Sequence, residues 1–303
     1  LDDLGDVAGR RVFVRLDLNV PLADGVVTDD ARIRASMPTL TELLERGASI
    51  VAASHLGRPH GRVDESLRLG PVAEPLAELL GRVVEYVPTD GVLSPEVEQS
   101  CKALAFEPGR VVLLENLRFD PGEEANDRAF AMRLADLADD YVDDAFGAVH
   151  RAHASVAALP EVLGEQGRTT AAGRLLQREV DALSRLLFEP ARPYVAVLGG
   201  AKVSDKLGTI GALVERVDAL LVGGAMAFTF IAADGGSVGD SLVEPLESFL
   251  DLKRRVCRGV MRAQDPDLAR VGPEAFKRYA DAHGLALELG AAHGQAVGVK
   301  GNH

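Results

Sequence analysis

Cysteine is scarce in this chain of 303 residues, which contains only Cys101 and Cys257. Two cysteines are too few for a disulfide framework and are typical of a protein in a reducing compartment. The chain also lacks an apolar run long enough to span a membrane, and residues 1–9 are acidic and small, with no apolar signal core. The sequence therefore predicts a cytoplasmic protein with no membrane partner.

Basic charge is also in deficit. The chain has 33 lysines and arginines against 46 aspartates and glutamates, which gives a formal net charge of −13. No basic tail offsets this charge, so a nucleic-acid partner is not expected. An acidic protein that binds an anionic substrate needs a local cluster of basic side chains.

Strand and helix patterns alternate along the first half of the chain. Apolar and β-branched runs predict strands, and residues at helical spacing follow them. The expected strands are residues 11–16, 49–53, 111–115 and 141–144, and the expected helices are residues 37–46, 71–81 and 127–137. This repeated order predicts an α/β fold with a doubly wound parallel sheet.

The stretch from Arg15 to Pro21 follows the first expected strand and reads Arg-Leu-Asp-Leu-Asn-Val-Pro. Pro21 cannot continue a paired central strand, so the strand surfaces here, where open α/β sheets usually bind ligands. Asp17 and Asn19 are two residues apart and share a face if the chain is extended. A carboxylate beside a carboxamide suits the hydroxyls and carboxyl edge of a small polyol acid. The alternative is an Asx pair that starts a turn.

Further polar side chains follow the other expected strands. Strand ends at one edge of a parallel sheet converge, so these residues can share one pocket. They are Asp17, Asn19, His55, Arg58, Arg118 and Arg151, together with Arg32 in the loop after the first strand. Guanidinium groups suit phosphate and carboxylate, which predicts an anion site. For any single arginine the alternative is a solvated surface ion pair, but that explanation weakens for several arginines at equivalent places.

The second half of the chain begins with a helical pattern over residues 169–188, which is expected to connect two domains. Residues 194–198 and 219–222 predict buried strands, and each runs into paired glycines. The first of these loops reads Gly199-Gly200-Ala201-Lys202-Val203-Ser204-Asp205-Lys206, and the second begins Gly223-Gly224. Such loops favour phosphate, because the backbone approaches closely and a helix N-terminus is positive. The sequence is not a Walker A motif, so glycines that only pack a tight turn are the alternative.

Together these motifs resemble the phosphoglycerate kinase family. The matching stretches are RLDLNVP at Arg15, TDDARIRA at Thr28, SHLGRP at Ser54, LLENLRF at Leu113, DDAFGAVHRAHAS at Asp143, LGGAKVSDK at Leu198 and GGAMAFTF at Gly223. They follow the family's order and spacing over about residues 1–244. The resemblance implies two Rossmann-like domains joined by a helix. The implied layout is a 3-phosphoglycerate domain over 1–168, a linker helix over 169–188 and a partial nucleotide domain over 189–245.

The same resemblance implies the site residues. Substrate binding would fall to Asp17, Leu18, Asn19, Arg32, His55, Leu56, Gly57, Arg58, Arg118 and Arg151. Nucleotide binding would fall to Gly200, Ala201, Lys202, Lys206, Gly223 and Gly224. Arg32 and Lys202 would be catalytic, and no residue is expected to bind a metal directly. The implied ligands are ATP or ADP with Mg²⁺, 3-phosphoglycerate and 1,3-bisphosphoglycerate, and the implied state is a monomer.

After about Pro245 the resemblance stops. The family's tryptophan-containing Gly-Pro segment, its acidic residue for the ribose and its Gly-Gly-Asp-Thr turn are absent, and the chain has no tryptophan. Residues 246–303 instead predict helices over 247–258 and 274–283 and a glycine-rich end. His283, His293 and His303 recur at a spacing of ten, which matches no metal-ligand pattern, so they are interpreted as solvated histidines.

This unassigned tail leaves several hypotheses open. It can be a divergent terminus, a frame-shifted translation or a fusion of unrelated coding sequence. Unless it covers the second sheet, one sheet edge is open there and nucleotide affinity is expected to be poor. The chain is then either a phosphoglycerate kinase, a truncated or chimeric module that binds 3-phosphoglycerate without turnover, or a product that does not fold past Phe230.

Overall fold

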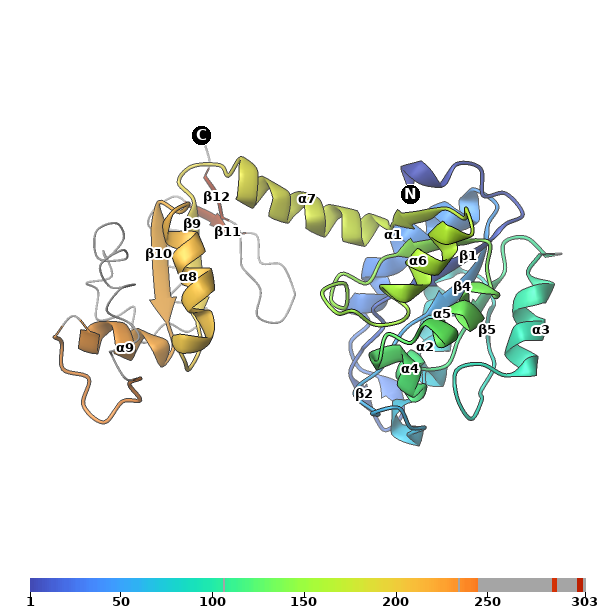
Figure 1. Ribbon diagram of the computed structural model, residues 1–303, viewed down its shortest axis with the longest axis horizontal. Helices are drawn as coiled ribbons and strands as arrows, with labels where there is room; N and C mark the ends of the chain where they lie inside the picture. Colours follow the sequence, from blue (N-terminus) through green and yellow to red (C-terminus); the bar gives the residue numbers. More distant parts are fainter. Residues whose placement is uncertain (106, 234, 245–284, 288–298, 302–303) are drawn as a thin grey trace. The chain divides into compact units, whose positions relative to one another are not determined.

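The chain forms two compact units, Leu1–Ala182 and Leu183–His303, which we call unit 1 and unit 2 (Figure 1). None of the helices in the described part of the chain combines the length and apolarity that crossing a membrane requires. The computed structural model describes residues 1–105, 107–233, 235–244, 285–287 and 299–301.

Unit 1 is built on a six-stranded sheet whose paired neighbours are all parallel. The strand order is β5-β6-β4-β1-β7-β8. The strands are β1 (Arg11–Arg15), β4 (Ser49–Ala53), β5 (Val84–Tyr86), β6 (Val111–Leu113), β7 (Asp140–Asp143) and β8 (Thr170–Ala172). A short antiparallel ladder apart from this sheet joins β2 (Leu22–Ala23) and β3 (Val26–Val27).

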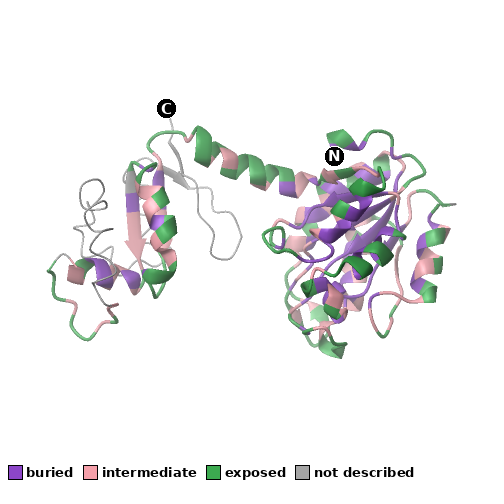
Figure 2. Ribbon diagram, in the orientation of Figure 1, coloured by how far each residue is buried: buried purple, intermediate pink, exposed green. Residues whose placement is uncertain are grey.

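Helices pack on both faces of this sheet, because successive residues of a strand point to opposite sides. Val12 of β1 lies in the core that includes Leu40 of α1, whereas Phe13 lies in the core that includes Phe130 of α5. Figure 2 shows the strands buried between these layers. The helices are α1 (Ala31–Glu45), α2 (Gly70–Leu80), α3 (Pro95–Ala103), α4 (Pro121–Glu124), α5 (Arg128–Ala135), α6 (Ala158–Glu165) and α7 (Arg174–Phe188), with 3-10 turns η1 (Asp2–Leu4), η2 (Glu65–Leu67) and η3 (Leu117–Phe119). The predicted doubly wound parallel sheet is confirmed.

The strand order reverses direction next to β1. The chain leaves β1 toward β4, and β5 and β6 follow on that side, whereas β7 and β8 lie on the other side. In open α/β sheets such a reversal leaves a crevice at the carboxyl ends of the strands, where ligands bind. The segments that follow β1, β4, β6 and β7 therefore frame the candidate site.

Two predicted helix boundaries are wrong. The helix predicted from residue 37 begins at Ala31, so Arg32 lies in the first turn of α1 rather than in a loop. Proline is common in the first turn of a helix, so Pro38 favours a helix that starts near residue 37. In the structure Pro38 lies inside α1 instead. The helix predicted over residues 169–188 is α7 only from Arg174. Its first residues form β8 instead, because they pair with β7 at the edge of the sheet.

Unit 2 contains a parallel pair of strands, β9 (Val195–Gly199) and β10 (Ala219–Gly223). Ile210 and Met226 lie in its apolar core. Its other described elements are η4 (Ser204–Lys206), α8 (Leu207–Val214), α9 (Met226–Ala233) and the antiparallel pair β11 (Leu285–Leu287) and β12 (Val299–Gly301). The helices predicted over 247–258 and 274–283, and the histidines predicted to be solvated, lie outside the described residues.

Candidate functional site

The carboxyl ends of the central strands lie at the same level. Arg15 is in register with Ala53 of β4 and Asp143 of β7. Backbone hydrogen bonds continue this alignment past the strands, since Leu16 N donates to Ala53 O at 2.8 Å and Asp144 N donates to Arg15 O at 2.8 Å. The segments that leave these strands therefore start side by side.

Asp17 joins the segment after β1 to α1. Arg32 Nη1 donates to Asp17 Oδ2, and Asn19 N donates to Asp17 Oδ1 at 3.3 Å. Asn19 Oδ1 accepts from Gly57 N at 2.9 Å, so the carboxamide oxygen holds the loop after β4. The segment after β7 also approaches Asp17. Its Gly147 lies so close that a Cβ atom added there would be only 2.5 Å from Asp17 Oδ2. Three segments thus meet at this carboxylate.

Arg15 is a member of the site that the sequence analysis missed. Its side chain is fully buried, with 0% exposed. Arg15 Nε donates to Ser155 Oγ at 2.8 Å, and Nη2 lies 3.2 Å from His55 Nδ1. Ser155 in turn donates from Oγ to Glu123 Oε1 at 2.6 Å, so the buried guanidinium reaches a buried carboxylate through a hydroxyl. The available signal was an arginine directly after the apolar Val-Phe-Val of a central strand, at its carboxyl end.

His55 is neutral in this environment. Burial, followed by the nearby guanidinium groups of Arg15, Arg118 and Arg32, lowers its pKa to about 2. The imidazole therefore contributes hydrogen bonds but no positive charge at physiological pH. The positive charge of the site comes from its arginines.

Arg118 carries an unsatisfied donor. Its side chain is 6% exposed, and Nη1 donates to Gly57 O at 2.8 Å. Nε is buried and has no hydrogen-bond partner among the described residues, and it lies 3.4 Å from Glu124 Oε1. Burial lowers the pKa of Arg118, the charge of Glu124 raises it, and the charges of Arg15 and Arg151 lower it again. Nε is thus ion-paired with Glu124 but makes no hydrogen bond with the described residues, and a buried donor without a hydrogen bond is costly, which favours an anionic ligand at this position.

The structure brings together most of the predicted substrate residues. Asp17, Arg32, His55 and Arg118, with Arg15, form what we call the anion cluster. Two other predicted residues, Arg58 and Arg151, are exposed, and their side chains make no hydrogen bond or ion pair with the described residues.

Leu18 and Leu56 were also predicted to bind substrate, and both side chains are buried in the core of unit 1. Leu18 N donates to Ser54 Oγ at 2.8 Å, and Leu56 O accepts from Asn116 Nδ2 at 2.8 Å. Their backbone groups therefore shape the loops around the anion cluster.

In unit 2 the ends of β9 and β10 meet through glycines. Gly224 has a φ of +68°, and a Cβ there would lie 3.0 Å from Gly200 O, so only glycine fits without strain. Gly223 pairs with Gly199 in the strand register. Lys206 Nζ donates to Gly199 O at 2.9 Å. Ala201 and Lys202 are exposed beside them.

Glu244 is a further residue that the sequence analysis missed. Its carboxylate accepts from Val203 N and Ser204 N, the latter at 3.0 Å, and from Ser204 Oγ at 2.6 Å. These bonds lower the pKa of Glu244, with a smaller effect from Lys202. The carboxylate thus occupies two backbone donors at the start of η4, beside the predicted nucleotide loop. The predicted nucleotide residues Gly200, Ala201, Lys202, Lys206, Gly223 and Gly224 stay predictions.

The comparisons with known proteins agree with this arrangement. A family model described as phosphoglycerate kinase matches residues 1–265. The chain belongs to the phosphoglycerate kinase family. Phosphoglycerate kinase from Moorella thermoacetica is 53% identical over 244 residues, which cover 80% of this chain and 60% of that protein. The Thermomicrobium roseum phosphoglycerate kinase is 56% identical over 239 residues, which cover 79% of this chain and 59% of that protein.

A solved phosphoglycerate kinase structure also matches. The structure from Coxiella burnetii has a TM-score of 0.69 and 34% identity, and the match covers 98% of this chain and 69% of that chain. The resemblance seen in the motifs is thus confirmed, and the phosphoglycerate kinase family model extends it past Pro245 to residue 265. The chain spans about three fifths of the length of the curated relatives it matches.

Proposed function

We propose that this chain acts in reversible phosphoryl transfer between ATP and the carboxylate of 3-phospho-D-glycerate, giving ADP and 1,3-bisphosphoglycerate. This is the phosphoglycerate kinase reaction of glycolysis. The observation that carries the proposal is the anion cluster, where the buried Nε of Arg118 has no hydrogen-bond partner among the described residues. An acidic chain that collects arginines at one sheet edge is suited to a small anionic substrate.

On the substrate side we propose two sets of contacts. Asp17 and Asn19 would hold the hydroxyl and carboxyl end of 3-phosphoglycerate. The phosphate and carboxylate would bind the guanidinium groups of Arg32, Arg58, Arg118 and Arg151 and the neutral imidazole of His55. The exposed side chains of Arg58 and Arg151 make no hydrogen bond or ion pair with the described residues, so no such contact has to break when the ligand binds.

The chemistry needs no general base. The substrate carboxylate is already ionised at neutral pH, since carboxyl pKa values lie near ~4. A carboxylate oxygen forms a bond to the γ-phosphorus of ATP, and the bond from that phosphorus to the β-γ bridging oxygen breaks, so ADP leaves with the electron pair. The protein must align the two groups and neutralise charge on the transferring phosphoryl group. We assign that role to Arg32 and Lys202.

On the nucleotide side we propose that the phosphates of ATP or ADP contact Lys202 and Lys206. Gly200, Ala201, Gly223 and Gly224 would line the adenine side, where three glycines and the single methyl group of Ala201 allow a close approach. Among the described residues, no group of three or more His, Cys, Asp or Glu side chains is arranged to hold a metal. Mg²⁺ would enter with the phosphates of the nucleotide and supply charge neutralisation.

The predicted domain layout changes at one boundary, because β8 belongs to the sheet of unit 1. We propose residues 1–172 as the substrate domain, α7 (Arg174–Phe188) as the linker and residues 189–245 as the part of the nucleotide domain that this chain holds, with 246–303 unassigned. A monomeric state and a cytoplasmic location stay predictions.

A second candidate is a chain that binds 3-phosphoglycerate without turnover. One observation favours it: the carboxylate of Glu244 occupies the backbone donors of Val203 and Ser204 beside the predicted nucleotide loop. The first candidate needs an intact nucleotide site, whereas the second needs only unit 1.

Calorimetry separates the two candidates. The chain would be titrated with 3-phosphoglycerate and with magnesium ATP, and a coupled phosphoryl-transfer assay would be run on the same sample. Binding of both ligands with turnover is the expected result for the kinase. Binding of 3-phosphoglycerate alone would establish the second candidate, and binding of neither would refute the proposed function.

A further inference from the structure

Asn116 lies directly after β6, and its side chain is fully buried. The carboxamide Nδ2 donates to Leu56 O at 2.8 Å and to Leu67 O at 2.9 Å, while Oδ1 accepts from Arg118 N at 3.1 Å. Both of its N–H donors and its oxygen are therefore used. Two of the three partners belong to residues next to or within the anion cluster.

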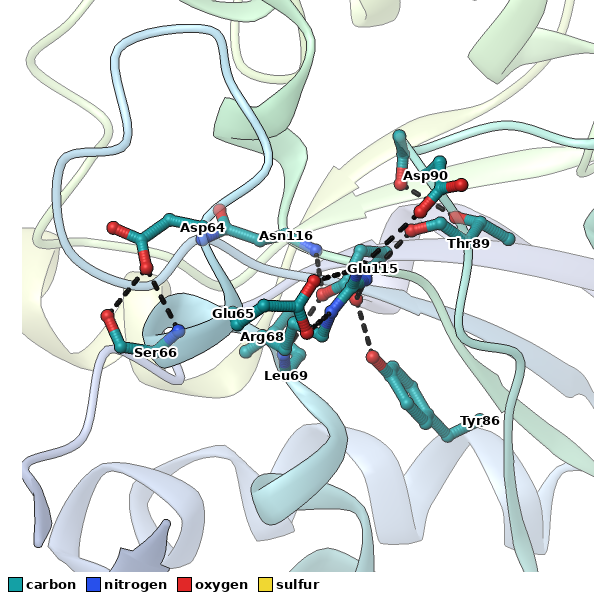
Figure 3. A network of polar contacts seen from close by, with 11 residues as sticks. Asp64, Glu65, Ser66, Arg68, Leu69, Tyr86, Thr89, Asp90, Glu115 and Asn116 are labelled. Carbon is teal, nitrogen blue, oxygen red and sulfur yellow. Dashed lines mark hydrogen bonds and ion pairs between the residues drawn. The ribbon is translucent and has the colours of Figure 1, made fainter. Parts of the chain in front are cut away.

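A buried carboxylate fixes the backbone of Asn116. Glu115 accepts from Asn116 N at 2.7 Å and from Leu69 N at 3.0 Å. It also accepts from Arg68 Nη1 at 3.0 Å and from the hydroxyl of Tyr86. Figure 3 shows these side chains converging on Glu115, with Asn116 beside it. A buried network in which every polar group is hydrogen-bonded is rigid, so the network holds the backbone of Asn116 in one position.

Asn116 and Arg118 each form a hydrogen bond from the turn after β6 to the loop after β4. Asn116 reaches Leu56 O, and Arg118 Nη1 donates to the next carbonyl along the chain, Gly57 O, at 2.8 Å. Two backbone bonds also join the loop after β4, which carries His55, to the turn after β6: Leu117 N donates to Ser54 O at 3.0 Å and Gly61 N donates to Arg118 O at 3.1 Å. The carboxamide of Asn116 adds a bond from inside the turn to each side, to Leu56 O and to Arg118 N, and so restrains the turn between those backbone bonds.

Arg118 has a competing partner. Its Nε makes no hydrogen bond with the described residues but already forms an ion pair with Glu124 Oε1, at 3.4 Å. If the turn after β6 shifts, the guanidinium can form a hydrogen bond with this carboxylate, and that bond would consume the donor left for a ligand. The restraint on Arg118 N by Asn116 opposes this shift.

We propose that Asn116 is a positioning residue for the anion cluster: it holds Arg118 and the His55 loop at the separation that the phosphate or carboxylate of 3-phosphoglycerate requires. The proposal rests on the proposed function for the identity of the ligand. It does not depend on the nucleotide side or on turnover.

The test uses the full chain with three substitutions. Asn116→Ala removes all three side-chain hydrogen bonds. Asn116→Ser keeps a hydroxyl that can accept from Arg118 N but cannot reach Leu56 O. Tyr86→Phe is the matched control, because it removes one hydrogen bond of the same buried network and leaves those of Asn116 intact.

Two measurements are made on each protein: affinity for 3-phosphoglycerate by calorimetry, and exchange of the Arg118 amide hydrogen. We expect Asn116→Ala to weaken binding about tenfold or more and to speed exchange at Arg118. Asn116→Ser should weaken binding but keep Arg118 protected, and it carries the test if the alanine variant does not fold. Tyr86→Phe should lower the melting temperature and leave affinity within about twofold.

Affinity of Asn116→Ala within about twofold of the native chain would overturn the proposal, as would an equal loss in Tyr86→Phe. If the native chain does not bind 3-phosphoglycerate, the proposed function fails. The exchange measurement then still decides whether Asn116 positions Arg118, because unchanged protection in Asn116→Ala would refute it without any ligand.

Discussion

In unit 1 the guanidinium of Arg15 is fully buried and bonded to the hydroxyl of Ser155, whereas in unit 2 Lys202 is exposed and Lys206 holds a backbone carbonyl. Buried charge must be compensated, so the arginines of unit 1 come with carboxylates, hydroxyls and carboxamides that hold them in place. The exposed Lys202 needs no such support, and the half-buried Lys206 has only a backbone carbonyl. The comparison teaches that the proposed substrate site of unit 1 is organised before a ligand arrives, while at the proposed nucleotide site of unit 2 Lys202 would take its position from the ligand.

The largest effect should come from Arg15. Arg15→Met leaves the buried carboxylate of Glu123 without the positive charge that it reaches through Ser155, and breaking such an arrangement costs about 3 kcal/mol or more. Urea unfolding followed by circular dichroism would measure the free energy of unfolding.

The double variant Arg15→Met with Glu123→Gln should recover part of that loss, because it removes the uncompensated charge. Lys206→Met, in the exposed site of unit 2, serves as the control and should change stability little. A similar loss for Arg15→Met and Lys206→Met would break the comparison between the units.

The next largest effect should be on the rate of phosphoryl transfer. Removing a preorganised positive donor typically raises the barrier by about 3 to 4 kcal/mol, so Arg32→Ala or Lys202→Ala should lower kcat by orders of magnitude with a milder change in KM. Steady-state kinetics in the coupled assay would measure both constants. Arg34→Ala is the control for Arg32, because Arg34 is on the same helix and pairs with Asp30 at the surface. Equal losses in kcat and in binding would refute the assigned roles.

A third prediction concerns how the free energy of unfolding depends on pH through Asp144, which lies at the start of α7. Burial raises the pKa of Asp144 to about 6, although Leu175 N and Leu176 N donate to its Oδ1. A carboxyl whose pKa is raised on folding binds more protons in the folded state, so it makes stability fall as pH rises from about 4 to about 6. A shift of this size corresponds to roughly 3 kcal/mol.

Asp144→Asn should remove that part of the pH dependence, and urea unfolding at several pH values would show it. Asp127→Asn is the control, since Asp127 caps α5 in an exposed position. An unchanged pH slope in Asp144→Asn would show that another group titrates there.

The smallest effect should come from Glu244. Glu244→Gln keeps an acceptor for the backbone of Ser204 but removes the negative charge beside Lys202. We expect a small loss of thermal stability and tighter binding of magnesium ATP, because a carboxylate repels the incoming phosphates. Calorimetry would measure the affinity, with Asp240→Asn as a charge-matched control from the same exposed segment. Weaker ATP binding in Glu244→Gln alone would instead show that the cap organises the nucleotide site.

Several parts of this protein could be predicted from residue pattern alone. Apolar runs placed the central strands within one or two residues, because a strand buried on both faces needs a continuous apolar run. The convergence of Asp17, His55 and Arg118 followed from their places after parallel strands. Short elements such as β5 and α3 were not predicted, since three to nine residues give a weak periodic signal.

The sequence by itself determined the central strands, the parallel sheet of unit 1 and several of the residues that meet at its edge, because period and spacing are local properties. Only the tertiary structure decided how those residues are used. It buried Arg15, made His55 neutral, left Nε of Arg118 without a hydrogen bond among the described residues and set Glu244 on the β9–α8 loop. Burial and long-range pairing depend on segments distant in the chain, so the charge state and partner of a side chain follow from the packed structure.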